Sequence, residues 1–207
     1  MSTSAPSLSA SEAFKARRSV YALSDEDLPI TDARVQEIIN RAILHTPSPF
    51  NSQDGRAVLL VKDEHKKFWD IAYDVAKATA SPEIFEKLYV GRLKMFRAAY
   101  GTVLFYSDPA PLKALEAKWP MIQDKFAQWA DQENGMLQYA VWTMLSAEGL
   151  GCSLQHYNPS VDSRVGAEWN IPAEWNLQAQ LVFGKPVAPA REKTFEPLEG
   201  RVFVHGA

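Results

Sequence analysis

Apolar side chains recur at helical spacing along most of the chain. The clearest set follows Thr31, whose hydroxyl can cap a helix, and consists of Val35, Ile38, Ile39, Ala42 and Ile43. Residues three and four apart share one face of a helix, so this set predicts an amphipathic helix. The same reading predicts further helices over residues 11–18, 66–79, 82–99, 111–132, 134–148 and 161–170, with a break allowed at Pro120.

Short runs of branched and aromatic residues lie between these helices and predict strands. They are Arg56–Lys62, Gly101–Asp108, Cys152–Pro159 and Leu177–Gly184. One more strand-like segment, Arg201–His205, follows a proline-rich extended arm, and such arms commonly pair with a partner subunit. We therefore expect a dimer with exchanged tails.

Composition limits the domain organisation and the compartment. The 207 residues are 46% hydrophobic, enough for one core, so we expect a flexible tail over 1–10 and a single domain over 11–207. The opening MSTSAPSLSA lacks the basic and apolar regions of a secretory signal. A single cysteine, Cys152, excludes a disulfide framework within the chain and fits a reducing compartment, so we expect a cytoplasmic protein.

Charge and the missing motifs exclude several functions. Lys and Arg total 22 against 25 Asp and Glu, a net charge of −3, which gives no general attraction for nucleic acid or anionic membrane. No apolar run is long enough to span a membrane. No dinucleotide-binding, P-loop or zinc-hydrolase motif occurs, and the four histidines lack metal-ligand spacing, so we expect no metal. Cys152 and His156 lie roughly 13 Å apart on an extended strand, too far for a nucleophile and its base.

A cation pair precedes the first extended segment. Arg17, Arg18 and Ser19 supply two guanidinium groups and a hydroxyl, which suit a phosphate monoester. The alternative is a solvated last turn of a helix, where cations complement the helix dipole. These residues alone do not decide between the two.

Two further segments suit a flat polar ligand. The proline-stiffened loop Pro47–Gln53 presents Ser48, Asn51, Ser52 and Gln53, whose side chains can hydrogen-bond a ring edge or a polyol chain. Gly149 and Gly151 allow close approach of backbone to a planar group. Ordinary turn chemistry and a plain helix stop explain the same residues.

In chain order, five strings resemble the FMN-dependent nitroreductase family. They are ARRSVYAL, PSPFNSQ, LKMFRAAYGTVLFYSD, AEGLGCSLQHYNP and GKPVAPAREKTFEPLE. In detail they are similar to the subgroup of fungal fatty-acid-repression-mutant proteins and bacterial copper-induced nitroreductases. The resemblance implies an α+β fold with a central mixed, mostly antiparallel sheet flanked by helices. It also implies a homodimer with an exchanged C-terminal arm over residues 185–207 and two FMN molecules at the interface.

The same resemblance implies a set of cofactor-binding residues. They are Arg17, Arg18, Ser19, Tyr21, Ser48, Asn51, Gln53, Lys94, Gln155, His156, Arg191 and Lys193. By this resemblance, the loop with Ser48, Asn51 and Gln53 is expected to reach the flavin of the other subunit. Lys94 is expected near the pyrimidine edge, where a cation favours reduced flavin. Two positions depart from the family pattern: Tyr21 replaces a common basic residue, and Phe195 replaces the second cation of a Lys-x-Arg phosphate clamp, for which Arg191 can compensate.

The implied activity is transfer of electrons from NADH or NADPH to a small aromatic oxidant, a nitroaromatic or a quinone, by ping-pong hydride transfer. The flavin carries the redox chemistry, so no protein nucleophile is needed. Five aromatic residues either line the substrate side or belong to the core: Phe96, Tyr100, Trp119, Phe126 and Trp129. Two alternatives stay open: a pathway-specific oxidation, dehalogenation or aromatisation, and a non-catalytic flavin-binding regulator in stress or lipid response.

Overall fold

The computed structural model describes residues 8–206. The elements in chain order are α1 (Ala10–Ala16), β1 (Leu23–Ser24), α2 (Asp32–His45), η1 (Pro49–Asn51), β2 (Gly55–Val61), α3 (Lys62–Thr79), α4 (Pro82–Ile84), η2 (Phe85–Val90), α5 (Gly91–Arg97), β3 (Gly101–Ser107), α6 (Pro109–Lys118), η3 (Pro120–Lys125), α7 (Phe126–Ala147), β4 (Gly151–Gln155), α8 (Asp162–Trp169) and β5 (Asn176–Pro186). Of the expected tail, residues 1–7 lie outside the described residues, and Ser9 caps α1 through the backbone N–H of Glu12. Within the described part, no helix is both long and apolar enough to cross a membrane.

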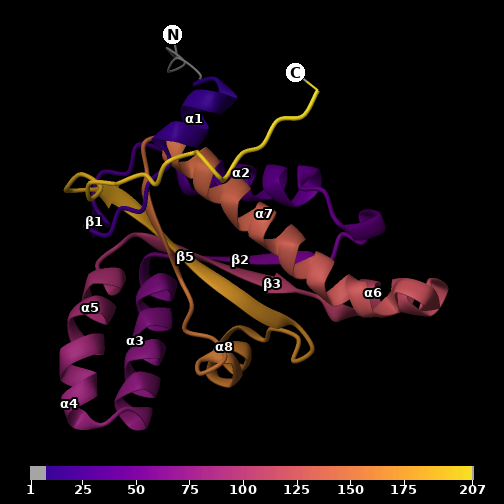
Figure 1. Ribbon diagram of the computed structural model, residues 1–207. Coiled ribbons are helices and arrows are strands. Elements are labelled where there is room, and N and C mark those ends of the chain that lie inside the picture. Colours follow the sequence, from indigo (N-terminus) through magenta and orange to yellow (C-terminus); the bar gives the residue numbers. More distant parts are fainter. Residues whose placement is uncertain (1–7, 207) are drawn as a thin grey trace.

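The long strand β5 organises the sheet. It pairs with β3 along one edge and with β4 and β1 along the other, while β2 pairs with β3. Every ladder is antiparallel, and an isolated bridge between Ser19 and Cys152 adds one parallel link. The expected α+β fold is confirmed, because helices cover both faces of this sheet (Figure 1).

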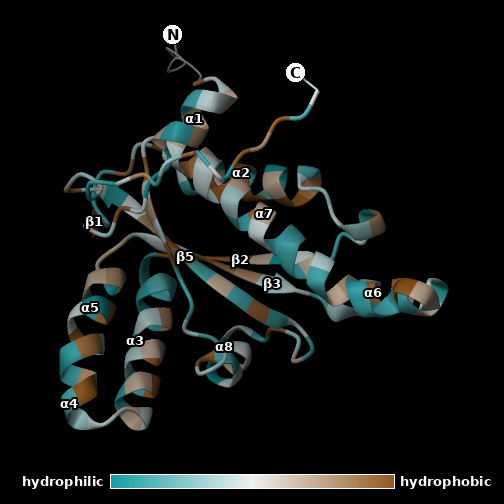
Figure 2. Ribbon diagram, in the orientation of Figure 1, coloured by the Kyte–Doolittle hydropathy of each residue, from teal (hydrophilic) through white to brown (hydrophobic). Residues whose placement is uncertain are grey.

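Alternating side chains of β3 feed two cores. Val103 and Phe105 point to one face and pack with α2 and α7, whereas Leu104 and Tyr106 point to the other face, toward α3, α5 and α8. In Figure 2 the strands are mostly hydrophobic and the outer helix faces are hydrophilic. Both faces of the sheet are therefore buried, which explains why β3 reads as a continuous apolar run.

The predicted boundary between two helices at residues 132–134 is wrong. The break comes earlier, at Trp119 and Pro120, and α7 continues through this region without interruption. Proline lacks the N–H donor that a helix needs, whereas Asn134 is tolerated because its side-chain amide donates to the Tyr106 carbonyl at 3.0 Å. Glu133 and Asn134, at the predicted boundary, are buried.

Two predicted strands also need correction. The third strand ends at Gln155 rather than Pro159, because the buried side chain of Gln180 accepts from the Tyr157 N–H at 2.7 Å and donates to Asn158. The segment Arg201–His205 forms no strand, and no described strand of the same chain pairs with it. An isolated extended segment has no ladder to stabilise it.

Candidate functional site

The N-terminal cations are fixed beside the sheet. Helix α1 ends at Ala16, and the following segment turns extended and bonds to β4 through the Val20 N–H and the Cys152 carbonyl, 2.8 Å apart. Gly151 makes this approach possible, because a Cβ atom there would lie 2.5 Å from a Leu23 methyl carbon and 3.2 Å from the Val20 Cβ. The backbone therefore anchors the arginine pair at the edge of the sheet.

The chain tail returns to the same place. Arg18 donates to the carbonyl of Arg191, and the Arg191 guanidinium lies 5.7 Å from the centre of the Tyr21 ring. A cavity of about 250 Å³ opens here, lined by Arg17, Arg18, Ser19, Arg191, Glu192 and Lys193 beside Tyr21. Four cations face one carboxylate, so the cavity favours an anion of more than one charge.

Arg17 is held deeper than its neighbour. Its guanidinium carbon lies 4.5 Å from the centre of the Trp142 ring on α7. Its Nε atom is buried and has no hydrogen-bond partner among the described residues. A buried donor without an acceptor is costly, and a bound anion would supply that acceptor. The donor set therefore fits a phosphate group.

The cavity continues as a trough. A second cavity, of about 410 Å³, shares Tyr21 and Arg191 with the first and adds Arg92, Phe96 and Gln155. A third, of about 290 Å³, shares Arg92 and Gln155 with the second and extends past His156 toward α3. The three adjoining cavities, here called the trough, run from the cation cluster past the end of β4.

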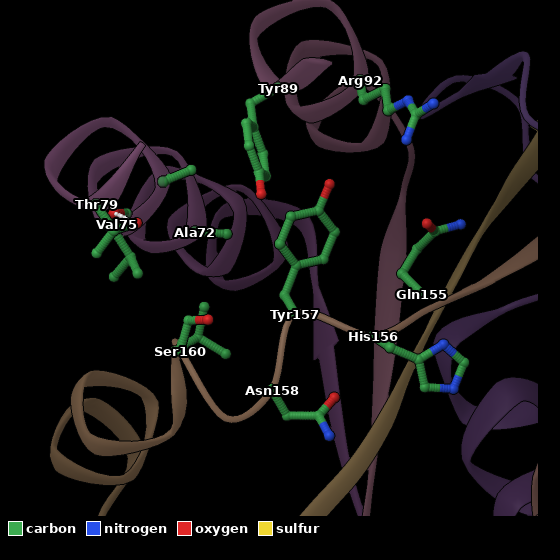
Figure 3. A pocket seen from close by; sticks show the side chains of 12 residues that line it. Ala72, Val75, Thr79, Tyr89, Arg92, Gln155, His156, Tyr157, Asn158 and Ser160 are labelled. Atoms are coloured by element: carbon green, nitrogen blue, oxygen red, sulfur yellow. Dashed lines mark hydrogen bonds between the residues drawn. The ribbon is translucent and has the colours of Figure 1, made fainter. Parts of the chain in front are cut away.

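Tyrosines close the far end of the trough. Tyr89 from η2 and Tyr157 from the loop after β4 point toward one another, with Arg92 and Gln155 to one side (Figure 3). Burial raises the pKa of Tyr157 to about 12, partly opposed by the positive charge of Arg92. Tyr157 is therefore a protonated hydroxyl at neutral pH and can donate a hydrogen bond.

The structure brings together eight of the expected site residues. Those that line the trough are Arg17, Arg18, Ser19, Tyr21, Gln155, His156, Arg191 and Lys193. Phe195 does not line the first cavity. Its ring contacts Lys193, whose Nζ atom lies 5.0 Å from the ring centre. Arg191 and Lys193 are thus the tail cations that reach the trough.

Lys94 does not line the trough, and Arg92 does. Both lie in α5, and residues two apart on a helix point about 200° apart around its axis, so only one of them can face the trough. Leu93 and Phe96 fix the orientation by packing into the core. The sequence did not single out Arg92, Tyr89 or Tyr157; the apolar spacing of Leu93 and Phe96 was the signal that separates Arg92 from Lys94.

The loop with Ser48, Asn51 and Gln53 lies elsewhere. Phe50 stacks on Trp129 in the N-terminal half of α7, with ring centres 6.3 Å apart, whereas Arg17 packs on Trp142 in the C-terminal half. The two contacts are about 20 Å apart along the helix at its usual rise per residue. Within one chain, this loop therefore does not join the trough.

The loop is rigidly built. Phe50, Asn51 and Gln53 have positive φ angles of 52°, 57° and 51°. Such angles cost energy in residues other than glycine and need support from the surroundings. That support includes the Ser48 hydroxyl, which accepts from the Gln53 N–H at 2.9 Å. Asn51 and Gln53 remain exposed at the surface.

A buried carboxyl group lies beneath this loop and was not anticipated from the sequence. Glu133 on α7 is 4% exposed, lines a cavity with Ser48 and Phe50, and its Oε2 atom has no hydrogen-bond partner among the described residues. Burial and the negative charge of Asp54 raise the pKa of Glu133 to about 7, while Arg56 opposes the shift. Its protonation state therefore changes near neutral pH.

Cys152 has no place in the chemistry. Its side chain is fully buried, and burial raises the pKa of the thiol, so it stays protonated. Of the five aromatic residues considered for the substrate side, Phe96 lines the trough, and Phe126 is buried core. Among the described residues, no cluster of three or more His, Cys, Asp or Glu side chains is placed to hold a metal ion.

The fold and the trough define an oxidoreductase of the nitroreductase family. The model of that family matches residues 14–185, and the chain belongs to it. Two proteins of Saccharomyces cerevisiae are similar over most of their length. HBN1, named a putative nitroreductase, is 40% identical, and the match covers 91% of this chain and 93% of HBN1. The nitroreductase FRM2 is 36% identical, and the match covers 86% of this chain and 89% of FRM2. The nitroreductase CinD from Lactococcus lactis, solved with nicotinic acid, is 39% identical, with a TM-score of 0.88 over 95% of this chain and all of CinD. Further CinD structures hold chloramphenicol and 4-nitrophenol.

Proposed function

We propose that this chain is a cytoplasmic, FMN-dependent NAD(P)H oxidoreductase that reduces nitroaromatic or quinone-type molecules. The observation that carries the proposal is the trough, in which four cations surround one end and an arginine and a glutamine flank the middle. That order matches the phosphate and the polar ring edge of a flavin nucleotide. CinD, with 4-nitrophenol bound, supports an aromatic oxidant.

Each part of the trough has a task in this proposal. Arg17, Arg18, Arg191 and Lys193 hold the FMN phosphate through charge-assisted hydrogen bonds, for which the unpaired Arg17 Nε is ready. Arg92 takes the role that the sequence suggested for Lys94 and places a positive charge beside the polar edge of the ring. Bound FMN supplies the redox chemistry, accepting hydride from NADH or NADPH and passing electrons to the oxidant.

The proposal includes a homodimer. The loop that carries Ser48, Asn51 and Gln53 packs on the N-terminal half of α7, whereas the trough lies beside the C-terminal half. This distance along the helix is too long for the loop to reach the trough of its own chain. These residues contribute to a flavin site only if a second copy presents its loop. The tail also fits an exchange between subunits, because large apolar side chains on it are exposed, among them Phe195 at 80% and Phe203 at 73%.

The first test is the visible absorption spectrum of the purified protein before and after addition of NADH without oxygen. We expect flavin bands that bleach, and that regain their colour when 4-nitrophenol or a quinone is added. Bands that persist with both NADH and NADPH would contradict the proposed electron donor. Protein that shows no bands even after FMN is added would favour the regulatory alternative.

The phosphate assignment has its own test with a matched control. Arg17→Ala removes a cation that faces the trough, whereas Arg201→Ala removes an exposed cation that, within residues 8–206, donates to the Glu196 carbonyl. We expect Arg17→Ala to weaken FMN binding by roughly tenfold or more, since a hydrogen bond to a charged group is lost. Equal retention of FMN in the two variants would reject the assignment.

A further inference from the structure

With FMN assigned to the first two cavities, the third cavity of the trough is left for a second molecule. It has a volume of about 290 Å³ and lies between α3, η2, α5 and the loop that follows β4. A cavity of roughly 150 Å³ is enough to hold a benzene molecule, so this one has room for a single ring with substituents. It shares Arg92 and Gln155 with the second cavity, to which the polar edge of the flavin ring is assigned. A molecule bound here would therefore lie next to the cofactor.

A π-helix places Tyr89 at this cavity. The segment η2 is a π-helix, a rare conformation that is frequent at functional sites. Its first residue, Phe85, is buried in the core, and the Tyr89 ring stacks on it with ring centres 6.5 Å apart. The core therefore fixes the position of the Tyr89 ring, and its hydroxyl points toward Tyr157 (Figure 3).

Tyr157 is held in the same way from the facing loop. Its ring packs edge-on against Trp69, with ring centres 5.3 Å apart, and against Phe96, with ring centres 6.3 Å apart. Its hydroxyl keeps its proton at neutral pH, because burial raises the pKa to about 12. Neither tyrosine hydroxyl bonds to a described residue, and neither is sealed off from the cavity. Two hydroxyl donors on rigidly packed rings thus face the same space.

The charges of the lining favour a negatively charged ligand. Of the twelve residues that line the cavity, Arg92 is a permanent cation and none is Asp or Glu. Arg92 acts on the tyrosines, because its positive charge lowers the pKa of the Tyr157 hydroxyl against the effect of burial. Opposite charges attract more strongly where water is partly excluded. An anion beside the two hydroxyls is therefore favoured.

The other polar side chains of the lining do not oppose this preference. The Thr79 hydroxyl donates to a backbone carbonyl one turn earlier in α3, at 2.9 Å. The side-chain oxygen of Asn158 is engaged by an amide donor from β5 at 3.1 Å. The ring of His156 points away from the tyrosine pair (Figure 3). Gln155 and Ser160 can donate as well as accept, so both tolerate an acceptor.

Two hydroxyl donors, one cation and no carboxylate favour an anionic acceptor. An ammonium group offers no acceptor, whereas a carboxylate has two oxygen atoms, one for each hydroxyl. We propose, on the basis of the flavin-dependent reduction proposed above, that this cavity holds the oxidant. Tyr89 and Tyr157 determine its specificity and select single-ring nitroarenes that carry a carboxylate para to the nitro group. The carboxylate accepts from both hydroxyls, and the nitro end is directed toward the second cavity.

The test is isothermal titration calorimetry on the FMN-loaded protein without NADH. It compares 4-nitrobenzoate with 4-nitrotoluene, which has a methyl group in place of the carboxylate, and 4-nitrobenzoate should bind roughly tenfold more tightly or better. Tyr89→Phe and Tyr157→Phe should each weaken 4-nitrobenzoate binding by roughly tenfold, because a hydrogen bond to a charged group is lost while the ring packing stays. The matched control is Tyr73→Phe, at a ring that packs on Phe85 and does not line the cavity, and it should leave binding unchanged.

No heat of binding for 4-nitrobenzoate up to its solubility limit would overturn the proposal. So would equal binding of 4-nitrobenzoate and 4-nitrotoluene, because that result requires only an apolar surface. Full preference for 4-nitrobenzoate in both Tyr89→Phe and Tyr157→Phe would also overturn it, since another group would then provide the selection. Failure of the proposed function looks different: the preference for 4-nitrobenzoate would be present, but the flavin bands would not bleach with NADH or NADPH.

Discussion

Glu133→Gln tests how a buried carboxyl group limits stability as pH rises. The side chain is 4% exposed, lies beneath the loop that carries Ser48, and stands near the buried carboxylate of Asp54. Asp54 already accepts hydrogen bonds from the hydroxyls of Ser52 and Ser107, so it is held in place and cannot turn away. Glutamine keeps the shape of the side chain and removes its charge.

The expected size follows from the pKa shift. The pKa of Glu133 rises from 4.5 to about 7, and each pKa unit corresponds to about 1.4 kcal/mol. Because the folded state binds this proton more tightly than the unfolded state, the free energy of unfolding falls as pH rises through the window from 4.5 to 7. The loss reaches about 3 kcal/mol above that window and is absent below it.

Urea unfolding at several pH values between 5 and 8, at fixed protein and FMN concentrations, measures the effect. The Gln variant should lose less stability than the unmodified protein as pH rises, so the difference between the two should grow in its favour by up to about 3 kcal/mol. The control is Glu86→Gln, at an exposed position. Parallel stability profiles for Glu133→Gln and the unmodified protein would refute the reasoning.

Two further predictions concern the core and the trough. Thr102→Val keeps the shape of a fully buried side chain but removes the hydroxyl that accepts from the Trp69 indole at 3.0 Å and bonds His65 at 2.9 Å. Urea unfolding should show that the free energy of unfolding falls by roughly 1–3 kcal/mol. An unchanged midpoint would show that these groups find other partners. Arg92→Leu should lower kcat/KM for NADH-driven reduction of 4-nitrophenol by roughly tenfold, whereas Lys94→Leu, two residues along the same helix, should change it little. The opposite order would restore Lys94 as the cation beside the ring.

Local pattern predicts the elements whose structure depends on local contacts. The spacing of Val35, Ile38 and Ile39 identified α2, and the branched apolar runs identified β2, β3 and β5. The errors occur where a contact with a residue distant in sequence determines where a helix or strand ends. Strand β4 ends because the Gln180 side chain accepts a hydrogen bond from the Tyr157 N–H. Asn134 is accommodated within α7 because its side chain donates to the Tyr106 carbonyl. Neither partner is near in sequence, so periodicity alone could not reveal either contact.

The candidate site shows the same division. The cations at residues 17, 18, 191 and 193 could be found from the sequence because short strings of residue types mark them. The short strings alone do not separate Arg92 from Lys94, because that choice needs the rotation of α5, which the apolar spacing of Leu93 and Phe96 indicates and their packing into the core sets. No local pattern marks Glu133 as buried. Only the position of α7 over Asp54 and Gly55 shows that it is buried.

The geometry of α7 explains how two incomplete sites become complete in the proposed homodimer. The loop with Phe50 packs on the N-terminal half of this helix and the cation cluster packs on its C-terminal half. Two copies related by a twofold axis near the middle of α7 would place each N-terminal half beside the partner's C-terminal half. The middle of the helix suits close approach, because Gly135 has no neighbouring atom within 4 Å of a Cβ position and Met136 is 46% exposed. In that arrangement each loop would face the trough of the other chain, and FMN binding and dimer formation would stabilise one another.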